Sequence, residues 1–268
     1  MKEKTMKKLY KVISMATLAL TLGTAAVFAD QQGTDIMQKA KDIAKPKFTH
    51  SMVEMVLTAK NGTQEVRSIE QYGRNQNDLT DIVMLFRSPA SVKDTRFLQK
   101  ENKGKDDDKW IYLPALQNTR RVNSSEGSKS FMGTDATYDD LSTREIDEDD
   151  HQYEGEESKV VGSTTYNCYK VKEVPYDKKS SQYSYRITWV DKDTYVPVYT
   201  EMYDKNSKLV KVLTVPTIKK EGGYTITYES LLENVQTGHK TNIKIVRLEL
   251  DKPIPDRVFT SNFLNTGK

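Results

Sequence analysis

Residues 183–189 read Tyr-Ser-Tyr-Arg-Ile-Thr-Trp, and in this stretch bulky aromatic or aliphatic side chains alternate with polar ones. A period of two places alternate side chains on opposite faces of an extended strand. No other stretch of the chain alternates as clearly. Tyr185, Ile187 and Trp189 therefore share one strand face, which we expect to point into an apolar interior.

The same period continues on both sides of this stretch. Val53, Met55 and Leu57 share one face of an earlier strand, and further strand patterns follow at intervals of 8–12 residues, separated by short polar turns. We count about eleven strands. Short connections make neighbouring strands antiparallel, and no long helices alternate with the strands, which excludes a parallel α/β fold. The chain is predicted to be mainly β, with an antiparallel sandwich or barrel.

Three local features refine this prediction. Residues 34–44 have apolar side chains at helical spacing before Pro46, which predicts an N-terminal helix. Asn61-Gly62 is typical of a tight type I′ hairpin turn. In the last long strand the apolar positions change from Ile243 and Ile245 to Val246 and beyond. This change of phase predicts a β-bulge.

Residues 1–29 have the three parts of a secretory signal peptide. A lysine-rich start is followed by an apolar run from Val12 to Phe28, and Val27 and Ala29 suit a cleavage site before Asp30. The alternative is an uncleaved N-terminal anchor. After cleavage, residues 30–268 are expected to form a single domain. Its net charge is −1, because the whole chain carries +3 and the removed segment carries +4. This balance gives no support to nucleic-acid binding.

The composition and motifs exclude several other classes. With 36% hydrophobic residues and a single cysteine, the chain is neither a polytopic membrane protein nor a disulfide scaffold. Cys168 is interpreted as a small buried apolar residue. The alternative, a nucleophile, requires a histidine partner, and none of the three histidines lies in a recognisable triad motif.

No pattern of metal ligands, phosphate-binding loop or nucleophile elbow is present. The acidic stretch of residues 145–157 is interpreted as a solvated loop, with cation binding as the alternative. We therefore expect no catalytic residue, no metal and no cofactor, and the protein is not expected to be an enzyme.

Two central segments resemble a known family. Residues 110–122, Trp-Ile-Tyr-Leu-Pro-Ala-Leu-Gln-Asn-Thr-Arg-Arg-Val, look like its W-x-Y-x-P…R-R strand pair, and residues 130–141, Ser-Phe-Met-Gly-Thr-Asp-Ala-Thr-Tyr-Asp-Asp-Leu, look like its S-F-x-G-x-D-x-x-Y-x-D-L loop. The pattern from Cys168 to Asp204 also fits. The chain thus resembles, over most of residues 35–260, the outer-membrane lipoprotein-sorting proteins of the LolA-like superfamily.

This resemblance implies a strongly curved antiparallel sheet that forms an incomplete barrel, with an N-terminal helix and short helices or a loop over its concave apolar face. It also implies a non-enzymatic periplasmic carrier that binds lipid or the acyl chains of lipoproteins in an apolar cavity and contacts the membrane transiently. Relatives of this subgroup are linked to inner-membrane transporters of the resistance-nodulation-division type. A non-enzymatic adaptor of such a transporter is therefore the alternative function, and a secreted hydrolase ranks last.

A curled sheet that does not close keeps an apolar concave face, where a lipid tail replaces core side chains. We expect both strand sets to point to that face, and the segment of residues 123–141 to act as a mobile cover. The alternative for each residue is an ordinary place in a solid core. The candidate wall and lid residues are Val53, Met55, Leu57, Trp110, Tyr112, Phe131, Met132, Tyr185, Ile187 and Trp189.

Overall fold

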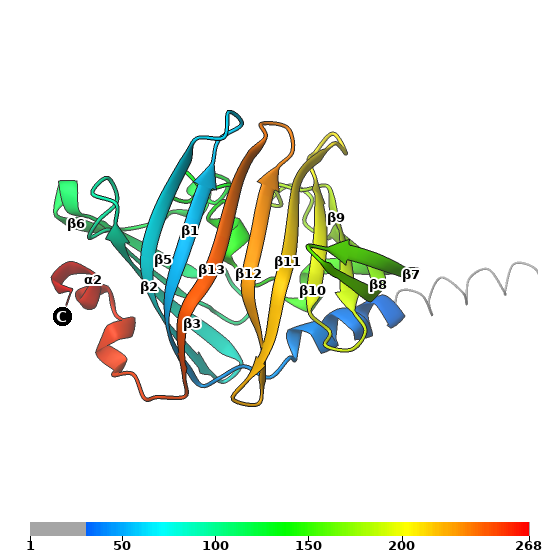
Figure 1. Ribbon diagram of the computed structural model, residues 1–268, viewed down its shortest axis with the longest axis horizontal. Helices are drawn as coiled ribbons and strands as arrows, with labels where there is room; N and C mark the ends of the chain where they lie inside the picture. The colour runs from blue at the N-terminus through cyan, green and yellow to red at the C-terminus, as the bar shows by residue number, and fades with distance from the viewer. Residues whose placement is uncertain (1–30, 268) are drawn as a thin grey trace, which may run out of the picture.

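Thirteen strands form one antiparallel sheet in the computed structural model, which describes residues 31–267 (Figure 1). The predicted signal peptide, residues 1–29, lies outside the described residues. The strands are β1 (Phe48–Thr58), β2 (Gln64–Gln76), β3 (Leu79–Ser88), β4 (Arg96–Lys100), β5 (Asp108–Leu113), β6 (Asn118–Arg121), β7 (Asp149–Val161), β8 (Thr164–Pro175), β9 (Tyr185–Asp191), β10 (Pro197–Tyr203), β11 (Leu209–Glu221), β12 (Tyr224–Asn234) and β13 (His239–Leu250).

The order of the strands across the sheet is β6-β5-β4-β3-β2-β1-β13-β12-β11-β10-β9-β8-β7. The first and last strands in the chain thus pair at the centre, whereas β6 and β7 are the two edges, so the sheet curves strongly but stays open (Figure 1). The prediction of an incomplete antiparallel barrel is confirmed. The sheet has thirteen strands where about eleven were expected.

The helical segments are short. A helix occupies residues 31–41, slightly before the predicted 34–44. The others are η1 (Pro114–Leu116), η2 (Ser124–Glu126), η3 (Asp139–Leu141), η4 (Ile146–Glu148), η5 (Asp256–Phe259) and α2 (Ser261–Thr266). None of the helices in the described part of the chain has the length and apolar character needed to cross a membrane.

The predicted bulge lies in β13. Met52 pairs with Arg247 and the next residue, Val53, pairs with Ile245, so Val246 is the extra residue. The predicted type I′ turn at Asn61-Gly62 is wrong. The last pair of this hairpin joins residues 58 and 64, and only Gly62 has a positive φ, of 85°. A type I′ turn needs two consecutive residues with positive φ, whereas this hairpin has a longer loop in which one such residue suffices.

Separate elements cover the two faces of the sheet. Figure 1 shows the green segment between β6 and β7, residues 122–148, inside the curve of the sheet; we call it the strap. Beside it, the helix of residues 31–41 packs Ile36 against Val171 and Val190. The C-terminal η5 and α2 pack on the outer face, where Phe259 and Phe263 contact Leu85 of β3 and Leu98 of β4. The concave face is therefore covered by a helix and an irregular loop, as predicted.

Candidate functional site

The register of the sheet determines which side chains face the strap. Six residues are direct neighbours in one row that crosses the sheet from β1 to β9, and side chains in such a row share a face. The row consists of Leu57, Thr241, Leu232, Leu213, Thr200 and Thr188. Leu57 belongs to the cluster that packs against the strap, so the whole row lies on the concave face.

Val53, Met55 and Leu57 therefore lie on the concave face, as expected, but the second predicted set does not. Thr188 is in the concave row, so its neighbours Ile187 and Trp189 point to the outer face, and Tyr185 shares that side. The expectation that both sets share the concave face is wrong. Alternation determines which residues of one strand share a face, but the relation between two distant strands depends on every register and bulge between them.

On the outer face, the end of the β7–β8 hairpin lies over this second set. The Nζ of Lys159 in β7 is 3.8 Å from the ring centroids of both Trp189 and Tyr199. A Cβ on Gly162, at the tip of the hairpin, would lie 3.3 Å from the Cβ of Pro216 in β11. Trp189 thus belongs to a small core of its own rather than to the wall of a concave cavity.

Trp110 and Tyr112 also lie away from the strap. In β5 the residue between them, Ile111, packs in the concave cluster, so the two aromatic rings point outward. There they contact the cluster formed with the C-terminal segment, and the guanidinium of Arg96 lies 4.4 Å from the centroid of the Tyr112 ring. The prediction that they line the concave side is therefore wrong for the same reason of strand parity.

Phe131 and Met132, at the centre of the strap, join the first set on the concave face. Phe131 is only 1% exposed, and its ring centroid lies 4.9 Å from that of Phe97 and 5.6 Å from that of Tyr138 in a tilted and an edge-on arrangement. The structure thus brings five of the ten candidate residues together. The buried strand residues of this cluster form an apolar floor on β1–β5, and Phe131 and Met132 belong to the strap that covers it. The floor consists of Val53, Met55, Leu57, Ile69, Phe86, Phe97 and Ile111.

Polar contacts fasten the strap above this floor. Arg67 of β2 donates a hydrogen bond of 2.6 Å from Nη1 to the carbonyl oxygen of Met132. Farther along, the carboxylate of Asp135 accepts a bond of 2.7 Å from the hydroxyl of Thr241 and lies 2.8 Å from Nδ1 of His239. Both partners belong to β13, so the strap is held to the centre of the sheet.

A second fastening is centred on Asp140. Its carboxylate accepts a hydrogen bond of 2.6 Å from Nζ of Lys211 in β11, one of 2.8 Å from the hydroxyl of Tyr183 and one of 3.2 Å from the side-chain amide of Gln182. Burial, and then the charge of Asp140 and the hydrogen bond to it, raise the pKa of Tyr183 well above its usual value. The hydroxyl therefore stays protonated and remains a donor to the carboxylate.

The strap also contacts the far side of the sheet. Lys109 of β5 donates a hydrogen bond of 2.6 Å to the hydroxyl of Ser142. Burial raises the pKa of the neighbouring Asp139, and the charge of Lys109 offsets part of that shift. Asp135 and Asp140 stand in the quoted loop pattern, but nothing in the sequence pointed to His239 and Lys211 as their respective partners.

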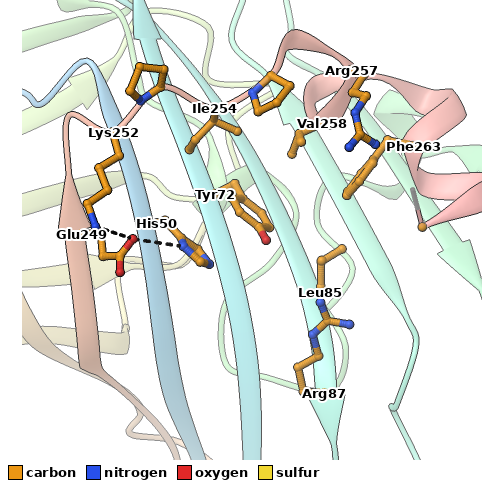
Figure 2. Close-up of a pocket in the computed structure, with 13 residues that line it drawn as sticks. His50, Tyr72, Leu85, Arg87, Glu249, Lys252, Ile254, Arg257, Val258 and Phe263 are labelled. Atoms are coloured by element: carbon orange, nitrogen blue, oxygen red, sulfur yellow. Dashed lines mark ion pairs between the residues drawn. The ribbon is translucent and has the colours of Figure 1, made fainter.

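Two surface hollows lie outside the apolar floor. The larger, of about 470 Å³, lies on the outer face beneath the C-terminal segment (Figure 2). Its base contains the stacked rings of His50 and Tyr72, 4.5 Å apart, and Figure 2 shows Glu249 paired with both His50 and Lys252. The smaller, of about 380 Å³, lies between the helix of residues 31–41 and residues 145–149.

The remaining predictions concern Cys168, the acidic stretch of residues 145–157 and metal binding. Cys168 is buried, and burial raises the pKa of its thiol to about 11. In the acidic stretch, Asp149 pairs with Arg144 and Arg186. Within residues 31–267, no group of three or more histidine, cysteine, aspartate or glutamate side chains is arranged to hold a metal ion.

These features define a class of protein: an open antiparallel half-barrel whose concave apolar face is covered by a loop and a helix rather than by a second sheet. A family model described as an uncharacterized protein matches residues 78–266. The match covers most of the chain, so the chain belongs to this family, the DUF1329-like family. No curated protein matches the chain significantly.

Solved structures extend this result. A DUF1329 family protein from Desulfovibrio piger is 28% identical, with 88% of this chain and 99% of that one covered and a TM-score of 0.81. A putative outer membrane lipoprotein-sorting protein domain from Vibrio parahaemolyticus is 27% identical, with the same coverage and TM-score. A LolA superfamily protein from Nitrosomonas europaea, 16% identical over 85% of this chain and 97% of that one, shares the fold with a TM-score of 0.63.

Proposed function

We propose that this protein is an exported, non-enzymatic carrier in the periplasm that binds lipid or the acyl chains of lipoproteins on its concave face. In this proposal the signal peptide is removed before Asp30, and residues 30–268 act as a single domain. The carrier contacts the membrane only transiently and needs no cofactor. The fold shared with a lipoprotein-sorting domain over nearly the whole of both chains supports this role.

The observation that carries the proposal is the way the apolar floor is covered. Val53, Met55, Phe97 and Ile111 are buried in one cluster with Phe131 and Tyr138 of the strap. The strap is held to the sheet by side-chain polar contacts rather than by sheet pairing. An acyl chain that displaces Phe131 gains about 0.8 kcal/mol for each buried methylene group. A long chain can therefore replace the apolar contacts that the strap supplies.

A reversible staple between strap and sheet tests this role. The side-chain oxygens of Asp135 and Thr241 are 2.7 Å apart, so the Asp135→Cys/Thr241→Cys pair is placed to form a disulfide that holds the strap down. We expect the oxidised protein to fail to bind a fluorescent fatty acid and the reduced protein to bind it.

A matched control is the Lys220→Cys/Thr225→Cys pair, which joins directly opposite residues of the β11–β12 hairpin away from the strap. Oxidation of this pair should leave binding unchanged. Equal binding by the oxidised and reduced forms of the strap pair would contradict uptake beneath the strap. A wild-type chain that binds no fatty acid would refute the carrier function.

The second candidate function is a non-enzymatic adaptor for an inner-membrane transporter of the resistance-nodulation-division type. Phe131 and Tyr138 already fill the concave floor, as expected of a protein that binds a partner without carrying lipid. Mass spectrometry of organic extracts of the purified protein separates the two functions. Lipid that co-purifies in stoichiometric amount supports the carrier, and its absence together with failure to take up fatty acid supports the adaptor.

A further inference from the structure

Three cationic side chains lie buried on the concave side of the sheet. Arg67 in β2, Lys109 in β5 and Lys211 in β11 are 5%, 7% and 6% exposed. Removing an ammonium or guanidinium group from water is costly unless an acceptor or an opposite charge replaces the water. Each of the three is in contact with the strap, through Met132, Ser142 and Asp140 respectively.

The strap is complementary to this surface in charge as well as in shape. Residues 130–142 contain Asp135, Asp139 and Asp140 and no basic residue. The same segment places Phe131 and Tyr138 on the apolar floor. It therefore presents apolar rings to one part of the concave face and carboxylates to another, which is the arrangement of an anionic amphiphile.

The three cations differ in what remains when the strap moves away. Arg67 keeps the carboxylate of Glu65, at 2.7 Å, and Lys109 keeps Asp107, at 4.0 Å. Lys211 makes its ion pair with Asp140 of the strap, and its other contact within the described residues is with the ring of Tyr183, 5.5 Å away. Displacement of the strap thus leaves Lys211 without a counter-ion, next to the hydroxyl of Tyr183, which has also lost its acceptor.

We propose that the cargo is an anionic lipid whose carboxylate or phosphate replaces Asp140 at Lys211 and Tyr183, while its acyl chain replaces Phe131 and Tyr138 on the apolar floor. This inference rests on the proposed carrier function and specifies the chemical class of its ligand. Lys211 is then a specificity-determining residue. A neutral lipid of equal chain length fills the same floor but leaves the lysine unpaired, so it binds more weakly.

Calorimetric titration with matched lipids tests the charge preference. Oleate and oleyl alcohol share one chain and differ in charge, and lysophosphatidylglycerol and lysophosphatidylcholine provide the same comparison for a phosphate headgroup. We expect the wild-type chain to bind each anionic member roughly tenfold more tightly than its partner. The oleate pair reports on a carboxylate and the lysophospholipid pair on a phosphate.

Three substitutions at the ion pair and one control substitution locate the preference. Lys211→Met should abolish it while oleyl alcohol still binds, and Lys211→Arg should retain it. Lys220→Met, on an exposed lysine of the same strand, is the control and should behave as wild type. Asp140→Asn removes the competing carboxylate of the strap and leaves Lys211 in place, so it should strengthen oleate binding. This variant keeps the test decisive if Lys211→Met lowers the content of folded protein in circular dichroism.

Equal affinity of the wild-type chain for charged and neutral lipids would overturn the anionic assignment while leaving the carrier function intact. A preference that persists in Lys211→Met would also overturn it, as would weaker oleate binding by Asp140→Asn. Failure of the wild-type chain to bind any of the four lipids would instead refute the carrier function itself.

Discussion

Truncation of Phe131 to alanine tests whether the strap opens as a unit separate from the sheet. The ring is 1% exposed and packs against Phe86, Phe97 and Tyr138. Phenylalanine-to-alanine changes at such sites cost about 3–5 kcal/mol. If the strap opens independently of the sheet, the substitution lowers the free energy of strap opening by this amount. The free energy of unfolding of the sheet then stays unchanged.

Native-state hydrogen exchange measures this difference. The strap contains backbone hydrogen bonds of 2.9 Å from the amide of Thr134 to the carbonyl of Phe131 and of 3.2 Å from the amide of Tyr138 to that of Lys129. In Phe131→Ala these amides should exchange faster by a factor on the order of 10² to 10⁴, which is the same free energy expressed as a ratio of rates. Amides of the central strands β1 and β13 should exchange as in the wild type.

The matched control is Phe97→Ala, which removes a buried ring of β4 from the same cluster. Because Phe97 belongs to the sheet, its truncation should lower the global free energy of unfolding by about 3–5 kcal/mol and speed exchange in strap and sheet alike. If Phe131→Ala also lowers the global stability by that amount and all amides change together, the strap is part of a single cooperative core and the reasoning fails.

Three further predictions concern other parts of the molecule. Burial alone would raise the pKa of Glu70, but hydrogen bonds from Tyr72, Arg87 and His50 outweigh it and lower the pKa to about 2. Because the folded-state pKa lies below the unfolded one, this carboxylate stabilises the fold above about pH 4.5 and loses that effect as the pH falls toward 2. Urea unfolding should therefore show Glu70→Gln destabilised at pH 7 and nearly equal to wild type at pH 2.5. The same loss of unfolding free energy at both pH values would contradict the pairing. The Cys168 thiol should resist iodoacetamide at pH 7.5 in the folded protein, because it is buried and its pKa is raised to about 11, and it should react in 6 M urea. Mass spectrometry measures the alkylation, and rapid alkylation of the folded chain would disprove this. Phe263→Ala should lower the free energy of unfolding by about 3–5 kcal/mol without changing fatty-acid affinity, since its ring packs on the outer face; impaired binding by folded protein would show that this face takes part.

Local patterns determined much of the architecture. Antiparallel strands followed from the period of two and the short turns, and the change of phase around Val246 predicted the bulge that the pairing of Met52 with Arg247 and Val53 with Ile245 shows. The two central segments indicated the half-barrel through their resemblance to the lipoprotein-sorting family. These features depend on neighbouring residues or on a continuous motif, so they are visible in the sequence alone.

The faces of distant strands were decided by the tertiary structure. The alternation around Ile187 showed that its strand has an apolar face, but not whether that face is the concave one. The answer depends on the five successive strand pairings that lead from Leu57 in β1 to β9, and on the bulges in those strands. One unrecognised extra residue in any of these strands reverses the assignment of every residue beyond it.

The sequence by itself determined that the protein is built from antiparallel strands, that the segment around Phe131 interrupts them with apolar residues, and that Asp135 and Asp140 accompany those residues. Only the tertiary structure decided that Phe131 of this segment packs on strands β1–β5 and that Asp140 meets Lys211. The two residues of that ion pair are 71 positions apart. Their contact exists because the sheet curves β11 toward the strap, and curvature is a property of all the strands together rather than of any one stretch of sequence.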